Sequence, residues 1–283
     1  RNFSGYCSRG RAKTSLKSNM KKTLVALSVA LVASASFVSN AFAGTLKVGA
    51  TPVPHAEILE FVKPALEKKG VKLEITEFND YVQPNLAVDA AELDANFFQH
   101  KPYLEVFVKD HGSDLVAVAG VHIEPMGLYS QKLKSIDDLK DGATIAIPND
   151  PTNGGRALLL LAKKGLITLE DPTSVVATVL DITENKKNLH FQELEAAQLP
   201  RALADVDAAI INSNYAIPAK LNPLTDSLLS EDADSPYVNI LVGNSESAKN
   251  PDIKVLVEEL TSKATAKFIL DTYKGAVVPA PAS

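Results

Sequence analysis

Residues 148–156, which read Pro-Asn-Asp-Pro-Thr-Asn-Gly-Gly-Arg, could bind an anion. An apolar run at 144–147 precedes them and a helical run at 157–162 follows, so we expect a strand, a glycine-bearing loop and a helix start. Unpaired N–H groups at a helix N-terminus attract anions, and glycines allow close approach. Arg156 adds a planar charged fork that fits a carboxylate. The alternative is an ordinary helix capped by Asn153, with Arg156 in solvent.

Two further segments could complete a site around that anion. Residues 94–103 place three aromatic side chains and His100 near the end of a predicted strand, where they could line an apolar pocket or pack in the core. Residues 209–215 form a buried strand that ends in two asparagines and a tyrosine, which could hold charged ligand groups or simply form a turn. The chain lacks the G-x-x-x-x-G-K-[ST] phosphate motif, so a carboxylate is favoured over a nucleotide.

Signals for metal binding and for nucleophilic catalysis are weak. The five histidines are scattered, and neither His55-Ala-Glu57 nor His122-Ile-Glu124 is followed by a second histidine at the metal-site spacing. The segment 243–247 fails the G-x-S-x-G pattern at its last position. We therefore predict no metal, no cofactor and no catalytic residues.

The N-terminal region predicts export. Met20 is followed by two lysines, an apolar stretch at 23–38 and an A-x-A cleavage site at 41–43. We expect residues 20–43 to be a cleaved signal peptide, with Gly44 as the mature N-terminus and 1–19 as an upstream artefact or scar. An uncleaved membrane anchor is the alternative, but the stretch is short and rich in alanine and serine.

Charge and cysteine content narrow the possible partners. From Gly44 onward 22 basic and 34 acidic residues remain, so the predicted mature chain has a net charge of −12. Such acidity argues against nucleic acid and anionic membrane surfaces as partners. The only cysteine, Cys7, precedes the signal, so we expect neither a disulfide nor a thiol nucleophile in the mature protein.

Strand and helix patterns alternate in two series, which predicts an α/β protein with two lobes. In the first series we expect strands at 45–50, 71–76, 93–97 and 115–121, and helices at 55–69, after Val82 and from 102, with stops at Gly70 and Gly112. In the second we expect a turn capped by Ser135, strands at 144–147, 189–194, 206–211 and 236–242, helices at 157–165 and 196–204, and one long helix at 252–272. Ligands of such folds bind at carboxyl ends of strands and between domains.

Four ordered segments resemble the methionine-binding (NlpA/MetQ) family of periplasmic solute-binding proteins of ABC importers. They are residues 76–85, 93–104, 147–158 and 209–216, and the likeness spans about 45–275. It implies a type II periplasmic-binding-protein fold with mixed, mostly parallel sheets flanked by helices, joined by two crossover strands. It places lobe 1 at 45–124 plus 241–283 and lobe 2 at 125–240, with the ligand cleft between them.

The resemblance also implies roles for individual residues. Arg156, with Gly155, would hold the α-carboxylate of an amino acid, and Asn214 and Asn239 would meet its α-amino and carboxylate groups. Asn153 would add a hydrogen bond from the loop. The thioether side chain of methionine would lie in a pocket formed by Tyr81, Phe98, His100 and Tyr103.

The family likeness implies a non-enzymatic periplasmic protein, expected to be monomeric, that passes L- or possibly D-methionine to a membrane permease with its ATPase. Many members have a lipobox cysteine after the signal, whereas Ala43-Gly44 stands here, so we expect a soluble protein without a lipid anchor. A methionine-containing dipeptide or another amino acid remains an alternative ligand. An enzyme using His100 as a base, or a surface interaction protein, are alternatives from other classes.

Overall fold

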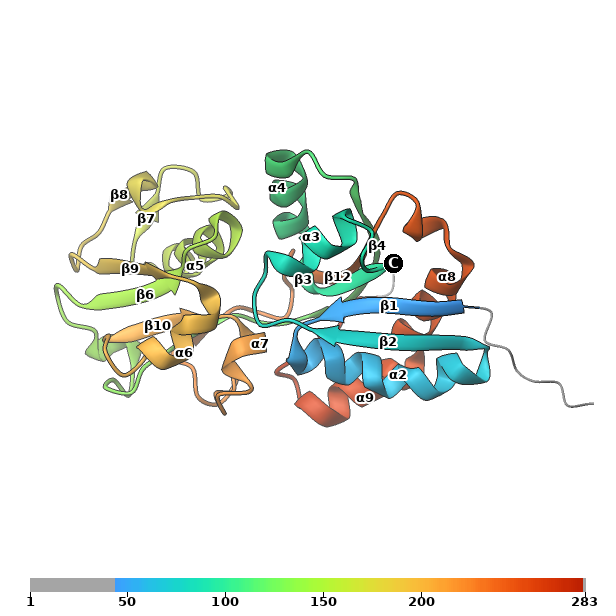
Figure 1. Cartoon of the computed structure of the whole chain (residues 1–283). Helices are drawn as coiled ribbons and strands as arrows, with labels where there is room; N and C mark the ends of the chain where they lie inside the picture. The colour runs from blue at the N-terminus through green and yellow to red at the C-terminus, as the bar shows by residue number, and fades with distance from the viewer. Residues whose placement is uncertain (1–43, 282–283) are drawn as a thin grey trace, which may run out of the picture. The chain divides into compact units, whose positions relative to one another are not determined.

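The computed structural model describes residues 44–281. The predicted upstream extension at 1–19, with Cys7, and the predicted signal peptide at 20–43 lie outside the described residues. Residues 44–281 form two lobes, each built around one β-sheet with helices packed against it (Figure 1). Within this range no helix has the length and the apolar character needed to cross a membrane.

The first sheet has six strands in the order β13-β4-β12-β3-β1-β2. Its strands are β1 (Gly44–Ala50), β2 (Val71–Glu77), β3 (Ala95–His100), β4 (Leu115–Ile123), β12 (Val238–Asn244) and β13 (Val278–Pro279). Along β2 the buried side chains of Val71 and Leu73 alternate with exposed lysine and glutamate, as the sequence predicts for a strand with one covered face.

The second sheet has five strands in the order β11-β5-β10-β6-β9. Its strands are β5 (Gly127–Tyr129), β6 (Thr144–Pro148), β9 (His190–Leu194), β10 (Ala208–Ile211) and β11 (Leu229–Ser230). A separate pair, β7 (Thr168–Leu169) and β8 (Ile182–Glu184), follows the second lobe's long helix.

Both sheets are mixed, as predicted, but parallel pairing does not dominate either of them. In the first sheet β1 pairs in parallel with β2 and β3, whereas β12 is antiparallel to β3 and β4, and β13 to β4. In the second sheet β6 is parallel to β9 and β10, and β5 is antiparallel to β10 and β11. The strands β5 and β12, each the first strand after the chain passes from one sheet to the other, run antiparallel to both of their neighbours.

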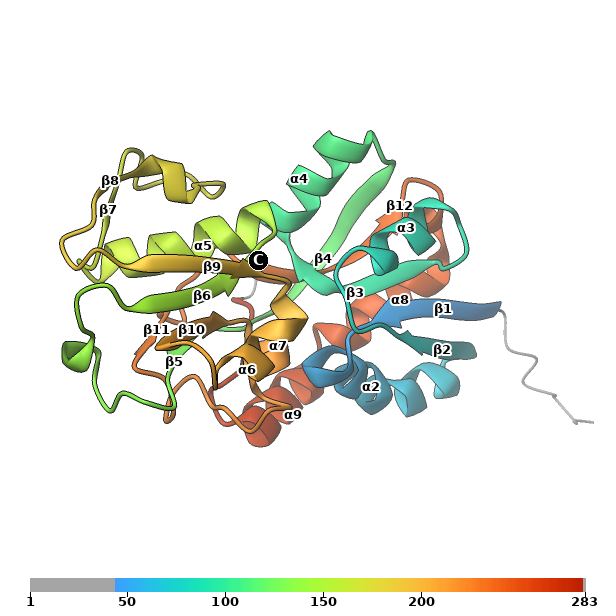
Figure 2. The same ribbon diagram turned by 60° about the vertical axis from the view of Figure 1, so that its left-hand side comes forward.

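Helices cover both faces of the first sheet. They are α2 (Glu57–Lys68), α3 (Gln83–Asp89), α4 (Lys101–His111), α8 (Pro251–Leu260) and α9 (Lys263–Tyr273). Leu241 of β12 packs in the core under α2, α8 and α9, whereas Ile240 and Val242 face the core under α3 and α4. The alternation follows from the two-residue period of a strand (Figure 2 shows the two layers).

The second lobe has three helices, α5 (Pro151–Lys163), α6 (Leu199–Ala202) and α7 (Ser213–Ala216). The predicted helix stops are confirmed in both lobes, because Gly70, Gly112 and Gly165 have φ values of 81°, 62° and 76°. Only glycine adopts this left-handed conformation without steric cost, and it ends the helix. The capping role of Ser135 is also confirmed, since its side chain accepts a hydrogen bond from the N–H of Asp137.

The prediction of one long C-terminal helix at 252–272 is wrong. The helix is interrupted after Leu260, and the side chain of Ser262 caps a new helix by accepting a hydrogen bond from the N–H of Thr265 at 3.1 Å. Apolar periodicity continues through both halves, which is why the pattern conceals the break. The serine and threonine are the local signal that the prediction overlooked.

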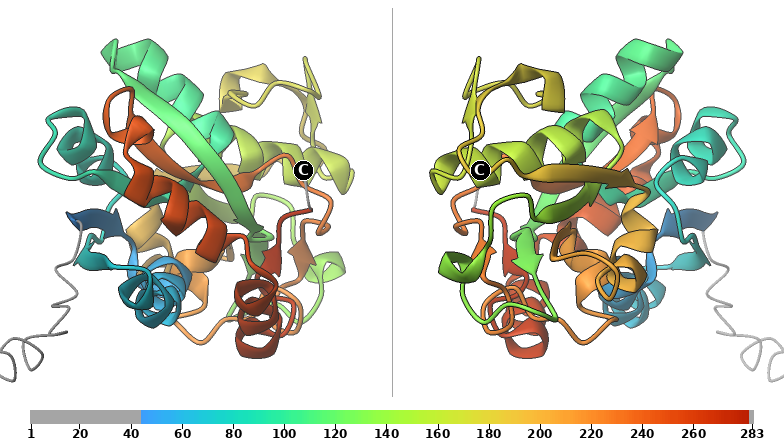
Figure 3. Two further views of the ribbon diagram at one scale, coloured as in Figure 1. Left: turned by 90° about the vertical axis from the view of Figure 1, so that its right-hand side faces the viewer. Right: turned by 90° about the vertical axis from the view of Figure 1, so that its left-hand side faces the viewer.

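The chain crosses between the two sheets twice. Residues 124–126 link β4 to β5, and residues 231–237 lead from β11 back to β12. The crossings are bonded to each other, because the N–H of Met126 donates to the carboxylate of Glu231 at 3.0 Å and the N–H of Glu231 to the carbonyl of Met126 at 2.9 Å. Figure 3 shows the long strand β4 running towards this junction.

Candidate functional site

A cavity lies between the two lobes, beside the crossings. Its walls are formed by residues of both lobes: Tyr81, Phe98, Gln99, His100, Tyr103, Glu124, Asn153, Arg156, Asn212, Asn214 and Asn239. Eight of the nine predicted site residues are therefore brought together, although they come from segments far apart in the sequence. Gly155 is the exception, and Gln99, Glu124 and Asn212 are the lining residues that the predicted set lacked.

Three aromatic rings form the wall contributed by the first lobe. The ring centroids of Tyr81, Phe98 and Tyr103 lie 5.9 Å from one another, at inclined or edge-on angles that aromatic pairs favour. The hydroxyl of Tyr103 donates to the carbonyl of Tyr81 at 2.7 Å, which fixes both rings. Phe97 faces the other side of β3 and belongs to the core, whereas Tyr103 both lines the cavity and packs against buried residues of the first lobe.

His100 is a neutral link between the lobes. Its Nδ1 accepts from the N–H of Tyr103 at 3.2 Å and caps α4, while Nε2 lies 2.8 Å from Oδ1 of Asn153 in the second lobe. Because Nδ1 accepts, the proton is on Nε2 and is donated to Asn153. Burial, and then the charge of Arg156, lower the pKa of His100 to about 3. Both ring nitrogens are thus engaged at neutral pH.

The prediction of a glycine-bearing loop before the helix is wrong, because residues 151–156 are already helical. Helix α5 begins at Pro151, so Gly154, Gly155 and Arg156 lie inside it, and Asp150 rather than Asn153 is the N-cap. The carboxylate of Asp150 accepts from the N–H of Asn153 at 3.0 Å, so a protein carboxylate already occupies the positive end of the helix. This cap disfavours the binding of a ligand anion at the N-terminal amides of α5.

The glycines of α5 serve packing. A Cβ at Gly155 would lie 2.6 Å from the carbonyl oxygen of Val175, and one at Gly154 would lie 2.9 Å from the carbonyl oxygen of Pro148. Gly155 therefore lets α5 approach a neighbouring backbone segment and does not line the cavity. The position of these glycines beside an arginine suggested a ligand cradle, but their contacts are internal.

Arg156 is buried, with 3% of its surface exposed, so the alternative of a solvated arginine is wrong. Its Nε and Nη2 donate to the two carboxylate oxygens of Glu231 at 2.7 and 2.6 Å, and Nη2 also donates to the carbonyl of Glu124 at 2.9 Å. The guanidinium carbon lies 4.2 Å from the ring centroid of Tyr237. Among the described residues Nη1 has no hydrogen-bond partner, and it remains as the donor that can face a ligand.

Asparagines form the wall contributed by the second lobe. The hydroxyl of Tyr81 donates to Oδ1 of Asn214 at 2.5 Å, and Nδ2 of Asn212 donates to Oδ1 of Asn153 at 3.1 Å. In the described part of the chain, Nδ2 of Asn214 and Oδ1 of Asn212 are buried without a hydrogen-bond partner. Such atoms cost free energy unless something else binds them. Asn212 occupies the N-cap position of α7 but makes no capping hydrogen bond, so the turn alternative does not account for it.

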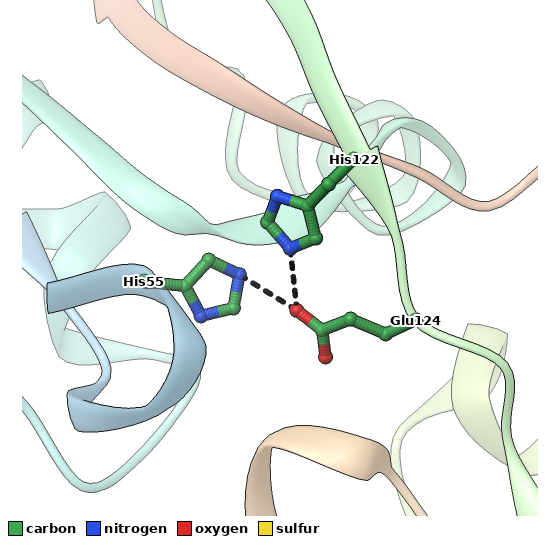
Figure 4. A group of neighbouring side chains, drawn as sticks. All are labelled: His55, His122 and Glu124. Carbon is green, nitrogen blue, oxygen red and sulfur yellow. Dashed lines mark hydrogen bonds and ion pairs between the residues drawn. The ribbon is translucent and has the colours of Figure 1, made fainter. Parts of the chain in front are cut away.

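Glu124 joins the cavity to a buried cluster with His55 and His122 (Figure 4). Its Oε1 lies 3.0 Å from Nε2 of His55 and 2.7 Å from Nε2 of His122. Burial opposes ionisation, but attraction and hydrogen bonds from the two imidazoles outweigh it and lower the pKa of Glu124. His122 lies near the end of β4 and Glu124 directly follows that strand, so the helical metal-site spacing does not apply to this pair.

A second, larger cavity of about 560 Å³ adjoins the first at Arg156. It lies along α5 and is bordered by Leu159, Pro172 and Tyr237. Its lining is mainly apolar, whereas polar atoms from two lobes converge only on the smaller cavity, and polar convergence is what fixes a ligand's orientation. We therefore take the smaller cavity as the candidate site.

Comparison with known proteins places the chain among substrate-binding proteins. The model of the NlpA lipoprotein family matches residues 46–281. The probable D-methionine-binding lipoprotein MetQ of Pasteurella multocida is 43% identical over 234 residues, which are 82% of this chain and 85% of that protein. The D-methionine-binding lipoprotein MetQ of Salmonella typhi is 45% identical over 236 residues, covering 82% and 87% of the two chains.

Solved structures agree with this assignment. A nutrient binding protein from Burkholderia cenocepacia, determined bound to methionine, superposes with a TM-score of 0.81 at 46% identity. The superposition covers 83% of this chain and 100% of that one. The predicted two-lobe periplasmic-binding fold is thus confirmed. On the family match and on these relatives, the chain belongs to the NlpA lipoprotein family.

Proposed function

We propose that this protein is the substrate-binding component of an ABC importer and that it captures methionine in the cavity between its lobes. The observation that best supports the proposal is an aromatic wall in one lobe facing a buried arginine and unpaired amide atoms in the other. Relatives at 43–45% identity are named for binding D-methionine, and a structural relative was solved with methionine. These names support the same ligand class for this chain.

Polar atoms of both lobes would bind the ligand's α-carboxylate, because Arg156 and Asn214 belong to the second lobe and Asn239 lies on β12 of the first sheet. Nη1 of Arg156 and Nδ2 of Asn214 are donors that the described residues leave free, and Nδ2 of Asn239 has no hydrogen bond with them either. A carboxylate accepts several such bonds at once, and a charged donor strengthens them. Asn153 would act indirectly, since both polar atoms of its side chain are used within the protein.

The ligand's side chain would then lie against Tyr81, Phe98 and Tyr103. A thioether gains roughly 0.3–1.5 kcal/mol from each sulfur–aromatic contact, beyond the burial of its methylene groups. Burial raises the pKa of Tyr81 and Tyr103, so both remain neutral hydroxyl donors at physiological pH. The wall therefore offers apolar surface without adding charge.

Capture requires the lobes to move. The space inside the cavity is about 20 Å³, which holds a single water but not an amino acid. The hydrogen bonds from Tyr81 to Asn214 and from His100 to Asn153 hold the lobes together across it. We propose that the two crossings act as the hinge between the lobes predicted at 45–124 plus 241–283 and at 125–240, with the second boundary moved to 237/238 because β12 belongs to the first sheet, and that these contacts form on closure.

Catalysis is not part of the proposal. His100 was the candidate base for the enzyme alternative, yet its Nδ1 accepts a backbone N–H and its Nε2 proton is donated to Asn153. A general base needs a free lone pair within reach of the substrate. The relatives described above are binding proteins, which supports a role in capture rather than turnover.

Export, the partner complex and the oligomeric state remain proposals. We propose that the signal at 20–43 directs the protein to the periplasm, that it acts there as a monomer, and that it delivers its ligand to a permease with its ATPase. The relatives are named lipoproteins, whereas this sequence has Ala43-Gly44 at the predicted cleavage site. Mass spectrometry of the exported protein tests this, since we expect an unmodified Gly44 and an acylated N-terminus would contradict it.

A thermal-shift screen tests the proposed function. The protein is unfolded and refolded to remove retained ligand, then heated with each L- and D-amino acid and with Gly-Met. A ligand at 100 times its Kd stabilises the folded state by about 2.7 kcal/mol, which a melting curve resolves easily. We expect the largest rise in melting temperature with methionine, and no rise with any amino acid would refute the proposal.

A further inference from the structure

We infer that Glu124 binds the α-ammonium group of the ligand, so that the protein selects amino acids with a free α-amino group. The inference rests on the proposed function, because it concerns the same cavity. The arginine and asparagine donors can bind the carboxylate of an amino acid. They cannot bind its ammonium group, because a protonated amine accepts no hydrogen bonds. Within the cavity lining, Glu124 is the only side chain with a carboxylate.

The geometry of the carboxylate supports this role. Both imidazoles bind Oε1, and Figure 4 shows the second oxygen, Oε2, pointing away from them. Among the described residues Oε2 has no hydrogen-bond partner, although Glu124 is only 6% exposed. A nearly buried carboxylate with one oxygen fixed and the other facing a cavity is suited to a ligand cation.

His55 and His122 hold that carboxylate in place through Oε1. The hydroxyl of Thr51 lies 2.7 Å from Nδ1 of His55, and Nε2 of the same ring faces Glu124 and, at 2.9 Å, Oδ1 of Asn239. Burial lowers the pKa of His122, whose Nδ1 has no partner in this range, so that this ring presents a neutral N–H to Glu124.

The charge balance of the cavity leads to the same ligand class. The positive charge of Arg156 is matched by Glu231 at 2.6 Å, and in the described chain Glu124 pairs with two histidines and with no lysine or arginine. A zwitterionic amino acid adds no net charge and places its ammonium against Glu124. An acid without an amino group, or an N-acylated amino acid, would bring a negative charge to a desolvated site beside Glu124 without the ammonium that compensates it.

The same three residues do not form a good metal site. Their potential ligand atoms lie within 4.8 Å of one another, but both Nε2 atoms bear hydrogen directed at a single carboxylate oxygen. Zinc needs the lone pairs of those nitrogens at about 2.0–2.1 Å. The hydrogen-bond arrangement therefore favours a fixed anion over a bound cation.

The test compares the binding of two ligands to the wild type and to two variants in which a glutamate is replaced by glutamine. Calorimetry measures the Kd of methionine and of its deaminated analogue, 4-(methylthio)butanoate, for the wild type, Glu124→Gln and Glu231→Gln. We expect Glu124→Gln to weaken methionine by on the order of 30-fold or more and to leave the analogue unchanged or tighter, because only methionine has the ammonium and the analogue loses a repelling carboxylate. Glu231→Gln is the matched control, since it acts through Arg156 and should alter both ligands alike.

The ratio of the two Kd values does not depend on the fraction of folded protein, so partial misfolding of a variant does not obscure the result. One comparison uses the wild type alone. Methionine should bind to it much more tightly than either the analogue or N-acetylmethionine. If wild type binds methionine and the analogue equally, or if Glu124→Gln weakens both to the same extent, the inference is overturned and the proposed function stands.

Two other outcomes are decisive. If zinc chloride binds the wild type stoichiometrically and Glu124→Gln abolishes that binding, the cluster is a metal site and the inference is wrong. If the wild type binds no amino acid at all, the proposed function fails and this inference fails with it. The expected result is no zinc binding that depends on Glu124.

Discussion

Replacement of Arg156 gives the most informative perturbation of the site. Arg156→Gln removes a buried positive charge, and loss of one partner of a buried, hydrogen-bonded charge pair costs 2–5 kcal/mol of binding free energy in comparable cases. Taking about 3 kcal/mol, the Kd for methionine should rise roughly 150-fold. Titration calorimetry measures this directly.

The same variant must also lose stability, and the two effects have to be separated. Glu231 is left with 13% of its side chain exposed and without its cation, and breaking a buried pair typically costs 3–5 kcal/mol. The double variant Arg156→Gln/Glu231→Gln removes both charges and should recover most of the melting temperature. It should not recover affinity, because the ligand carboxylate still lacks the guanidinium.

Lys163→Gln is the control, because its ion pair joins α5 to the second crossing, as the pair of Arg156 and Glu231 does. Lys163 of α5 pairs with Asp232 of the second crossing at 2.7 Å, but their side chains are 63% and 64% exposed. Exposed pairs contribute little, so neither the melting temperature nor the Kd should change measurably. If the double variant binds methionine within about three-fold of wild type, Arg156 does not hold the carboxylate and the reasoning is refuted.

Three further predictions concern single contacts. Tyr81→Phe removes the 2.5 Å hydrogen bond to Asn214, which is worth about 1 kcal/mol, so the Kd for methionine measured by calorimetry should rise about five-fold. An unchanged Kd would show that this hydrogen bond does not stabilise the closed state. Gly155→Ala would place a Cβ 2.6 Å from the carbonyl oxygen of Val175, so the melting temperature should fall by several degrees with an unchanged Kd, and the reverse pattern would argue for a ligand contact. The pKa of His100 is lowered to about 3 in the folded protein, so between pH 6.5 and 3 the imidazole is protonated in the unfolded state but not in the folded state. The folded state is therefore fully stable with respect to this group above pH 6.5 and loses stability as the pH falls towards 3. His100→Gln should remove about 1.4 kcal/mol per pH unit from that slope in denaturant titrations, and an identical slope would contradict the neutral assignment.

Much of the fold could be predicted because local sequence signals and tertiary packing agree. The strand at 71–76 shows the two-residue period of a strand with one covered face, and the glycines at 70, 112 and 165 end their helices. Predictions failed where a local signal was outweighed by its context. The break at Ser262 was hidden by continuous apolar periodicity, and the start of α5 was misplaced because Pro151 and the two glycines read as a loop.

The sequence predicted which residues line the site better than it predicted the hydrogen bonds between them. Family likeness identified eight lining residues, but their partners depend on segments distant in sequence. No local pattern pairs Arg156 with Glu231, which are 75 residues apart, or brings His55 to Glu124 across the first lobe. Glu124 was missed because a helical metal spacing was applied to a segment at the end of β4, where His122 and Glu124 approach each other at two residues' separation.

The position of a bound ligand's sulfur tests the central claim most directly. The protein, produced with ordinary methionine so that Met126 is unlabelled, is crystallised with selenomethionine as ligand, and the anomalous signal locates selenium. We predict one peak in the cavity between the lobes, about 5 Å from the rings of Tyr81, Phe98 or Tyr103. A peak in the larger cavity beside Leu159 and Pro172, or none in either cavity, would contradict the account.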